Sequence, residues 1–485
     1  MSMLRKTVGM ILAGLLVAAS LCASLAVSPS DYNMAEPGNL VPEHLYAESA
    51  LVVDEDSGEV LFSKNSRVRM YPASTTKIMT LLLALESGID LDSEVTIPRE
   101  ASLIPDGSSV IPVKPGDVCT FRDLLYGFML SSGNDGANAI AVLVDDTLDD
   151  FVNHMNARAA ELGCEGTHYI NAHGYHDAEH YTTAQDLATI SRFAMQNETF
   201  RAIVATPTYE MKLTRGSKTG TATIVNRNSL LLKDDKYYYP DCTGIKTGHH
   251  RKAGWCFVGS AERDGKRVIC VALNCEEEEQ KWYDAARLFE YGFTRYESAD
   301  VQALMENAKA GFDTVEIADA AEDDPQNGSL RLNLEEVEVD GAPPQLPIGS
   351  DNAVILATEK LASTLEIEWE RELTAPVSQG EKLGTLRGTL PGGGTVTAIL
   401  TAERDVKVQP KATVAPTPAP SPETSAGENT SNGTSERSGR SGLGTMIALI
   451  GALIAVLLLW ASMVMRERRK RRRRARRRAA ARRRK

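Results

Sequence analysis

The sequence predicts an α/β domain built on a largely antiparallel sheet, followed by a smaller β-rich domain. Strand-like runs occur in neighbouring pairs, with helical runs between and after them, over about residues 45–295. From there to about residue 405, alternating apolar and polar residues are interrupted by Gly and Pro. Strands joined by short turns pair in antiparallel fashion, and helices in the same segment cover the faces of the sheet.

The strands of the first domain are predicted from apolar and β-branched runs that flank turn residues. Residues 50–54 and 60–62 predict two strands joined by a tight turn. Residues 253–261 and 267–273 predict a hairpin, because Asp264-Gly265 between them favours a two-residue turn.

The helices are predicted from apolar residues at helical spacing. Residues 124–144 have this spacing, broken by a polar Ser-Ser-Gly-Asn-Asp-Gly loop. Residues 282–291 also have it, and Gly292 predicts the end of that helix. In the second domain, residues 330–334 and 395–400 alternate as strands do.

The N-terminus predicts export from the cytoplasm. Residues 1–26 read as a signal peptide, because Arg5 and Lys6 precede an uncharged run that ends in small residues. Two alternatives are an N-terminal anchor that is not cleaved and a lipid-modified Cys22.

The C-terminus predicts a membrane anchor. Residues 409–442 are rich in Pro, Ser, Thr, Gly and Ala, which is typical of a flexible linker. Residues 443–465 carry no charge, and as a helix they would span about 34 Å, enough to cross a hydrocarbon core of about 30 Å. The basic tail 466–485 is then expected to stay in the cytoplasm. We therefore expect a single-pass cell-membrane protein whose two domains, at 42–296 and 297–408, are extracytoplasmic.

The charge is distributed unevenly. The tail 466–485 holds fifteen Lys or Arg and one Glu, so within a net charge of −12 the rest of the chain carries −26. A run of arginines alone is also typical of nucleic-acid binding. Directly after a spanning helix, it indicates instead a stop-transfer signal with affinity for anionic lipid headgroups. We expect no nucleic-acid partner.

Cysteine and histidine spacing favours neither a disulfide framework nor a metal site. The cysteines after the signal segment are Cys119, Cys164, Cys242, Cys256, Cys270 and Cys275. None lies in a C-x-x-C pair or a zinc-like spacing, so we expect ordinary buried residues, although the sequence leaves their pairing open. His173, His176 and His180 are close in sequence, but no comparable ligand set accompanies them. No metal and no cofactor is expected.

Ser74 and Lys77 are the first candidate catalytic residues. They lie three residues apart at the start of an apolar helical run, so their side chains share one face. A serine hydroxyl needs an adjacent base to act as a nucleophile, and a lysine amine can serve once burial or a neighbouring cation lowers its pKa. The pair alone is weak evidence, because Ser-x-x-Lys recurs by chance and usually only caps a helix.

Ser132-Gly133-Asn134 is the second candidate element, and it lies on the polar loop between two helical runs. A hydroxyl there can relay a proton, and an amide can bind a substrate carbonyl. The alternative is a simple turn, which these residue types favour in any protein.

Lys246-Thr247-Gly248 is the third element. A cation and a hydroxyl beside a glycine suit a carboxylate ligand that approaches the backbone closely. Lys218-Thr219-Gly220 is a second literal match, and Ser350-Asp351-Asn352 imitates the second element but follows the third. Order, spacing and flanking residues therefore decide between them.

In this order, S-x-x-K, S-x-N and K-T-G are the motifs of penicillin-binding proteins and class A β-lactamases. The flanking residues resemble the low-molecular-weight D-alanyl-D-alanine carboxypeptidases. They are Pro72-Ala73, Thr75-Thr76, Ser131, Asp135-Gly136-Ala137, Gly244-Ile245, His249, and the runs 180–184 and 226–231. The resemblance covers about residues 42–300 well and the β-rich domain more loosely. It implies the penicillin-recognising serine D,D-peptidase fold, with a helical subdomain beside the sheet, and it favours Lys246 over Lys218.

The resemblance also implies a reaction. Ser74 would attack the carbonyl of the penultimate D-Ala in a peptidoglycan stem peptide and form an acyl-enzyme as the terminal D-Ala leaves. Lys77 would accept the serine proton, Ser132 would relay protons, and Asn134 would hold the acyl side chain. β-Lactams would acylate the same serine.

The remaining family positions imply the binding of the terminal carboxylate and of the oxyanion. Lys246 and Thr247 would face the carboxylate, with Gly248 allowing close approach, and the N–H groups of Ser74 and His249 would form the oxyanion hole. Lys281 departs from the family, which commonly has Arg there as a carboxylate anchor. Lysine keeps the charge but loses the bidentate fork.

Other functions share part of this pattern. A class A β-lactamase needs a deacylating Glu between the second and third elements, and no Glu-x-x-Leu-Asn occurs there. A non-catalytic wall-binding protein is disfavoured because every motif residue is intact. A D,D-endopeptidase on the same fold stays open.

Overall fold

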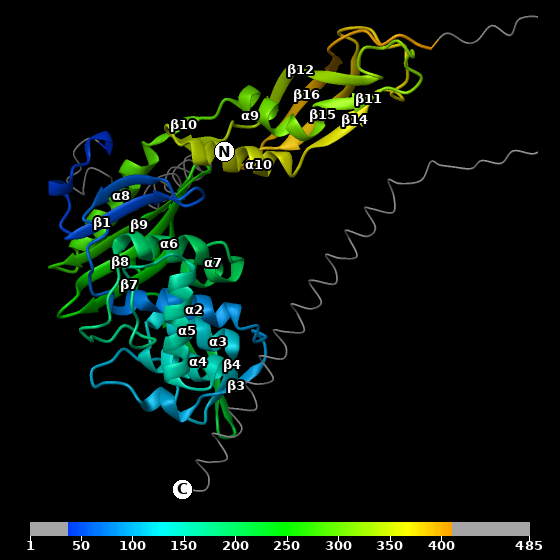
Figure 1. The fold of residues 1–485 in the computed structure, drawn as a ribbon. Coiled ribbons are helices and arrows are strands. Elements are labelled where there is room, and N and C mark those ends of the chain that lie inside the picture. The colour runs from blue at the N-terminus through cyan, green and yellow to red at the C-terminus, as the bar shows by residue number, and fades with distance from the viewer. Residues whose placement is uncertain (1–36, 410–485) are drawn as a thin grey trace, which may run out of the picture. The chain divides into compact units, whose positions relative to one another are not determined.

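The computed structural model describes residues 37–409 (Figure 1). The first part of this range contains a five-stranded antiparallel sheet in the order β2-β1-β9-β8-β7. Its strands are β1 (Ser49–Asp54), β2 (Val60–Lys64), β7 (Cys242–His250), β8 (Gly254–Arg263) and β9 (Lys266–Cys275). Because β1 pairs with β9 along its whole length, the beginning and the end of this domain meet in one sheet. The predicted antiparallel sheet is confirmed.

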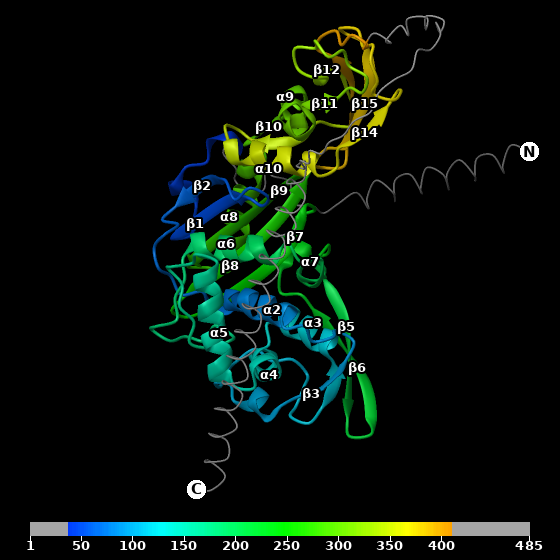
Figure 2. The same cartoon turned by 45° about the vertical axis from the view of Figure 1, so that its right-hand side comes forward.

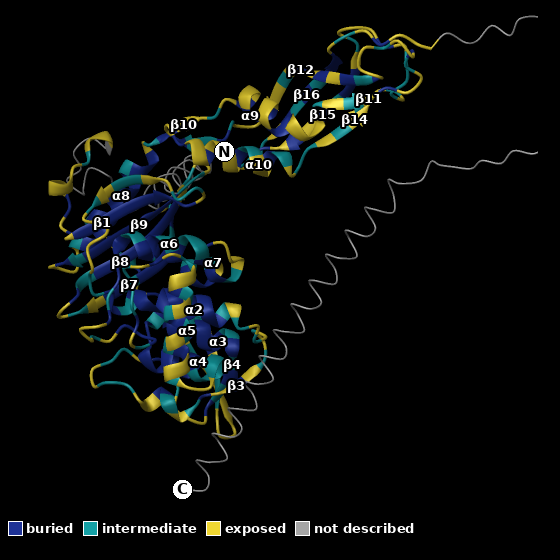
Figure 3. Ribbon diagram, in the orientation of Figure 1, coloured by how far each residue is buried: buried dark blue, intermediate teal, exposed yellow. Residues whose placement is uncertain are grey.

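Helices cover both faces of this sheet. The helices are α2 (Lys77–Glu86), α3 (Phe121–Ser131), α4 (Asn134–Asp145), α5 (Leu148–Glu161), α6 (Ala184–Ala194), α7 (Glu198–Ala205) and α8 (Gln280–Phe293). Leu51 and Val53 of β1 pack in one core with α2 to α7, whereas Ala50 and Val52 pack with α8 on the opposite face. Successive side chains of a strand point to opposite faces, so a strand covered on both sides is buried throughout. Figure 3 shows this for β1, β8 and β9.

A smaller antiparallel sheet lies beside the helices, in the order β3-β4-β5-β6. Its strands are β3 (Glu94–Thr96), β4 (Val118–Thr120), β5 (Thr208–Arg215) and β6 (Lys218–Val225). Figure 2 shows the β5–β6 hairpin extending past the helices. The second K-T-G triplet, at Lys218, is exposed on this hairpin.

The predicted interrupted helix at 124–144 forms, but its loop is shorter than expected. Only Ser132 and Gly133 separate α3 from α4, and the rest of the polar run lies within the two helices. Ser132 ends α3 with a left-handed backbone (φ 62°), and Gly133 begins α4 with an extended one. The predicted helix at 282–291 lies within α8, which continues one residue past Gly292.

The second domain is β-rich, as predicted, and has its own core. Its strands are β10 (Tyr296–Ser298), β11 (Thr314–Glu316), β12 (Ser329–Asp340), β13 (Gln345–Pro347), β14 (Glu366–Trp369), β15 (Lys382–Thr389) and β16 (Thr395–Ala402). The main sheet has the order β11-β12-β16-β15-β14, and β10 pairs with β13. Leu332, Leu386 and Leu400 lie in its core.

Two helices in this domain were not predicted, α9 (Val301–Ala308) and α10 (Asp351–Ala362). The hydroxyl of Ser350 accepts the N–H of Ala353 and caps α10. The triplet Ser350-Asp351-Asn352 is therefore a helix start, which is a common use of these residue types.

Short 3-10 turns complete the described chain: η2 (Pro37–Asn39), η3 (Pro42–His44), η4 (Ala73–Thr76), η5 (Arg99–Ser102), η6 (Ser229–Leu231) and η7 (Lys309–Phe312). The six cysteines of residues 37–409 are buried free thiols. The predicted signal segment 1–26, the linker after Gln409, the span 443–465 and the basic tail lie outside the described residues. Within 37–409, none of the helices combines the length and apolar character that a membrane crossing needs.

Candidate active site

Ser74 lies at the second position of η4, directly before α2. The residue before it, Ala73, has a left-handed backbone (φ 49°), which is uncommon for a residue with a side chain. The Thr76 hydroxyl donates to the Ala73 carbonyl oxygen at 2.8 Å. Gly174 (φ 84°) packs on the same carbonyl, since a Cβ there would lie 1.8 Å from the Ala73 oxygen. The unusual turn that presents Ser74 is thus held from two sides.

His180 supports this turn from the next layer. Its Nδ1 accepts the N–H of Ile170 at 3.1 Å, so Nε2 carries the proton and donates to the Thr76 hydroxyl at 2.8 Å. Burial lowers the pKa of His180 and of His173 to about 3, so both imidazoles are neutral near pH 7. In the part of the chain that the structure describes, no cluster of three His, Cys, Asp or Glu residues could hold a metal ion.

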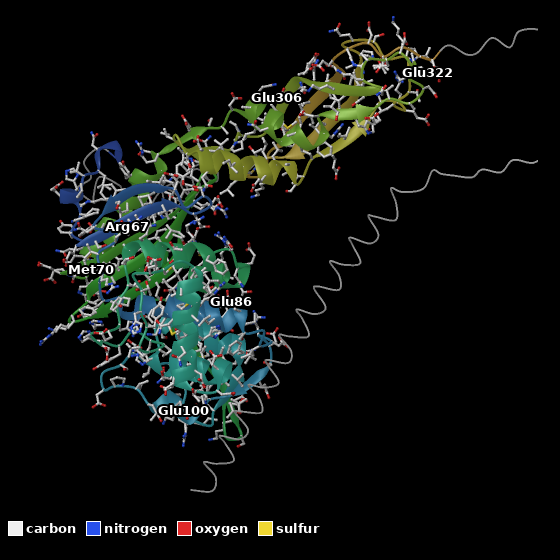
Figure 4. The ribbon with its side chains drawn as sticks, in the orientation of Figure 1. Arg67, Met70, Glu86, Glu100, Glu306 and Glu322 are labelled. Atoms are coloured by element: carbon white, nitrogen blue, oxygen red, sulfur yellow. The ribbon has the colours of Figure 1, made fainter. Side chains whose placement is uncertain are left out.

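The amine of Lys77 is fully buried and lies among three oxygen atoms. It is 3.1 Å from Ser74 Oγ, 2.8 Å from Asn134 Oδ1 and 2.8 Å from the His173 carbonyl oxygen. Glu86, which is labelled in Figure 4, lies at the other end of α2. It binds Arg158 of α5 at 2.7 Å, which ties α2 to α5. The structure therefore brings Ser74, Lys77 and Asn134 together.

The electrostatics favour a neutral Lys77. Burial lowers its pKa well below the usual 10.5, and the positive charges of Lys246 and Arg227 lower it further. The Asp135 carboxylate acts in the opposite direction, but burial raises its own pKa to about 6. An amine that is neutral near pH 7 can accept a proton from a hydroxyl beside it.

A loop, residues 108–111, fixes the orientation of Asn134. Ser108 Oγ accepts from Asn134 Nδ2 at 2.9 Å, and the Ser109 carbonyl accepts the Asn134 N–H at 2.7 Å. The buried Asp135 carboxylate accepts the Ile111 N–H at 3.1 Å. Since Asn134 Nδ2 donates to Ser108, its Oδ1 faces the Lys77 amine.

Ser132 lies between α3 and α4, next to Asn134 in the chain, and is almost fully buried. No hydrogen bond joins its hydroxyl to Ser74 or Lys77; the Lys77 amine bonds instead to Ser74, Asn134 and His173.

The third element lies within β7, the edge strand of the main sheet. An edge strand has unpaired backbone groups on its outer side, which an extended ligand can use. Gly248 packs on η4, because a Cβ there would be 3.0 Å from Ser74 N. Lys246 is buried and donates to the Thr247 carbonyl at 3.1 Å; burial, with the charge of Arg227, lowers its pKa to about 7.

His249 follows Gly248 in β7, and Lys281 is the second residue of α8. His249 is exposed and stacks on Trp255 of β8, its cross-strand partner. The Lys281 side chain is 1% exposed, and its amine contacts the Glu278 carboxylate at 3.2 Å and carbonyl at 3.0 Å.

Several contributing residues had no role assigned from the sequence: Thr76, Ser108, Asp135, Gly174, His180 and Arg227. Thr76, Asp135, His180 and Arg227 occur in the flanking runs that carry the family resemblance. Nothing local to Ser108 or Gly174 signals a role, because each acts on a residue far away in the chain.

Replacing Gly174 by alanine is expected to destabilise the protein by at least about 2 kcal/mol and to slow acylation of Ser74. The new Cβ would meet the Ala73 carbonyl, and that peptide cannot move without moving Ser74. Gly163→Ala is the matched control, because Gly163 has a similar φ (75°) but open space around it. It should lower stability by about 1 kcal/mol and leave the acylation rate unchanged. Equal losses in thermal denaturation and penicillin-labelling rate for both variants would contradict this role of Gly174.

The family model described as D-alanyl-D-alanine carboxypeptidase matches residues 36–277 of this chain. The D-alanyl-D-alanine carboxypeptidase DacB2 of Mycobacterium tuberculosis is 36% identical over 263 residues, which cover 53% of this chain and 86% of that protein. DacF of Bacillus subtilis, another D-alanyl-D-alanine carboxypeptidase, is 28% identical over 365 residues, covering 74% of this chain and 86% of the relative. The crystal structure of the Streptomyces K15 DD-transpeptidase has a TM-score of 0.49 at 34% identity, covering 52% of this chain and 98% of that chain.

The matched residues contain all three elements of the site, in the order and spacing described above. The chain belongs to the D-alanyl-D-alanine carboxypeptidase family.

Proposed function

We propose that this protein is a serine carboxypeptidase that removes the terminal D-Ala from peptidoglycan stem peptides. The observation that carries the proposal is the fully buried Lys77 amine, 3.1 Å from the Ser74 hydroxyl, in a member of this family. A buried amine with a lowered pKa beside a serine is a nucleophile with its base. The names of the relatives supply the substrate class.

In acylation, Ser74 Oγ attacks the carbonyl carbon of the penultimate D-Ala, and its proton passes to Lys77 Nζ. The negative charge that develops on the carbonyl oxygen is met by the N–H groups of Ser74 and His249. The C–N bond then breaks, and the nitrogen of the leaving D-Ala takes up a proton, with Ser132 as relay. Water later attacks the ester carbon of the acyl-enzyme and restores the serine hydroxyl.

Substrate binding uses the edge of the main sheet. The carboxylate of the terminal D-Ala is met by Lys246 and Thr247, and the missing side chain of Gly248 leaves room for its backbone. Asn134, held by Ser108 and Lys77, offers its amide to the acyl part of the substrate. A β-lactam carries a carboxylate and a strained acyl carbon, so it acylates the same serine, and the covalent adduct persists.

We further infer that the enzyme is exported and held in the cell membrane by residues 443–465, with its C-terminus in the cytoplasm. The uncharged run and the basic tail after it support this placement. A flexible linker on a fixed anchor raises the effective concentration of an enzyme near an immobile polymer.

The test uses the full-length protein in detergent. D-Ala release from an acyl-D-Ala-D-Ala peptide should persist in EDTA, and mass spectrometry after penicillin treatment should find the adduct on the peptide that contains Ser74. Release that requires a metal ion would overturn the serine mechanism. Penicillin turnover without D-Ala release would favour a β-lactamase, and cleavage of cross-linked dimers alone would favour an endopeptidase.

The pH dependence of kcat/KM should have an alkaline limit set by Lys246. This residue must be a cation to bind the carboxylate, and its pKa of about 7 means that it loses the proton as pH rises through neutrality. Lys77 must be neutral, so activity rises with pH on the acid side. Lys246→Arg should keep the cation and move the alkaline limit upward by at least about one pH unit. Lys266→Arg, at the far end of the β8–β9 hairpin, serves as the control. An unchanged alkaline limit in Lys246→Arg would assign that limit to another group.

A further inference from the structure

Three side chains form a stack beside the candidate oxyanion residue. The His249 ring lies parallel to the Trp255 ring, with centroids 3.8 Å apart and planes within 21°. The Lys281 amine lies 4.3 Å from the centroid of the same Trp255 ring. The same indole ring therefore contacts both the imidazole and the ammonium. Trp255 thus links a ring of β7 to a cation of α8.

The Lys281 amine is enclosed on its remaining sides. It lies 4.1 Å from the Trp282 ring and contacts both the carboxylate and the carbonyl oxygen of Glu278. Lys281 and Lys246 are both buried, but the Lys281 amine is already paired with a carboxylate of the protein, whereas the Lys246 amine bonds to the neutral Thr247 carbonyl. A lysine that binds a substrate carboxylate is expected to have no protein carboxylate beside its amine, and Lys281 has that of Glu278. Lys246 and Thr247 on β7 remain for that purpose.

We propose that Lys281 is a positioning residue, which acts through Trp255 on His249 at the end of β7 instead of binding the substrate carboxylate. The inference rests on the proposed function, because it assigns how one part of that active site is built.

Two contacts connect Lys281 to the candidate oxyanion hole, Lys281 to Trp255 and Trp255 to His249. Trp255 and His249 are directly opposite each other in the β7–β8 pairing, so each ring restricts the rotamer of the other and holds this end of β7 against β8. The His249 N–H is half of the proposed oxyanion hole, and such a donor must be aimed closely to stabilise a transition state. The His249 backbone is paired with β8 and its side chain is exposed near the end of β7, so the stack on Trp255 is what restrains the imidazole ring. Removing the cation should therefore lower kcat and leave KM nearly unchanged.

The first experiment compares two substrates in Lys281→Met. One is an acyl-D-Ala-D-Ala peptide, and the other is an acyl-D-Ala thioester whose leaving group has no carboxylate. A positioning role predicts a loss of about tenfold in kcat for both, the size expected of a desolvated cation–π contact. Lys281→Arg should restore most of the activity, since a guanidinium also stacks on indole. A loss confined to KM and to the carboxylate-bearing substrate would overturn the proposal and assign Lys281 as a direct anchor.

Two further measurements test the contacts of Trp255 themselves. Trp255→Leu combined with Lys281→Met should lose no more than the worse single variant, because both act through one contact. The Lys281 charge also adds to burial in lowering the pKa of His249, so the His249 imidazole should titrate at higher pH in Lys281→Met. Lys266→Met removes another lysine beside an aromatic ring, that of Tyr296. It should change neither kcat nor the titration of His249. If the wild-type protein released no D-Ala, the proposed function would fail, whereas an unchanged His249 titration would refute the stack itself.

Discussion

Replacing Ser74 by alanine is expected to abolish covalent penicillin labelling and to lower D-Ala release by about 10⁴-fold or more. Alanine removes the only atom of this residue that can form the acyl bond. Its small side chain fits the same turn, where Ser74 makes one side-chain hydrogen bond, accepted from Lys77. The fold should therefore persist, with a thermal midpoint within a few degrees of the wild-type value. Non-covalent binding of the substrate should also persist, since Lys246 and Thr247 are intact.

Ser87→Ala is the matched control for this variant. Ser87 lies just after the other end of α2, where its hydroxyl donates to the Ala84 carbonyl at 2.7 Å. It should cost a little stability and leave acylation unchanged. D-Ala release that survived in Ser74→Ala would refute Ser74 as the nucleophile, whatever the result with the control.

Replacing Lys77 by methionine is expected to slow acylation by about 10² to 10⁴-fold, the usual contribution of a general base. Methionine has nearly the same length and suits the buried position, so the change removes the amine and little else. Asn134 Oδ1 and the His173 carbonyl lose a donor each. The rate of penicillin labelling, measured under single-turnover conditions, reports acylation directly.

The same substitution should change how stability depends on pH. The pKa of Lys77 in the folded protein lies well below its unfolded value near 10.5. Between these two pKa values the unfolded chain binds one proton more, so the free energy of unfolding rises with pH by up to about 1.4 kcal/mol per unit for this group. Lys77→Met should lose that slope and be relatively more stable near neutral pH, where the buried lysine is costly.

Lys64→Met provides a comparison. Lys64 is a partly buried lysine whose amine also donates to a carbonyl oxygen, that of Leu45, at 2.8 Å. Its removal should leave the acylation rate unchanged. If Lys77→Met acylated at the wild-type rate, the base would have to be another group.

The elements that were predicted well are those whose signal is local. The strands at 50–54 and 267–273 are nearly continuous apolar runs and the helix at 282–291 has helical spacing, and each forms as expected. The helices α9 and α10 were missed although their buried residues have helical spacing, because both are short and lie among strand-like runs. The polar loop at 131–136 was drawn too long, since Asn and Asp there begin a helix instead of ending one.

The candidate site also has a part that local sequence predicts and a part that it does not. The spacing of Ser74 and Lys77 is a property of one helix turn, so it could be recognised in the sequence together with the order of the three elements. The bond from Lys77 to Asn134 spans 57 residues, and the bond to the His173 carbonyl spans 96. No local pattern predicts these contacts.

The sequence by itself determined which residue types carry the chemistry, the order in which they occur, and the family to which the chain belongs. Only the tertiary structure decided the pKa values, the backbone conformations and the contacts of these residues. Burial and the charges of Lys246 and Arg227 lower the pKa of Lys77, and Gly174 and His180 hold the Ala73 turn that precedes Ser74. Folding places Lys281 against Trp255 and Glu278, away from solvent. The physical reason is that desolvation, charge and close packing depend on every residue that folding brings near, whereas periodicity and motif spacing depend only on neighbours along the chain.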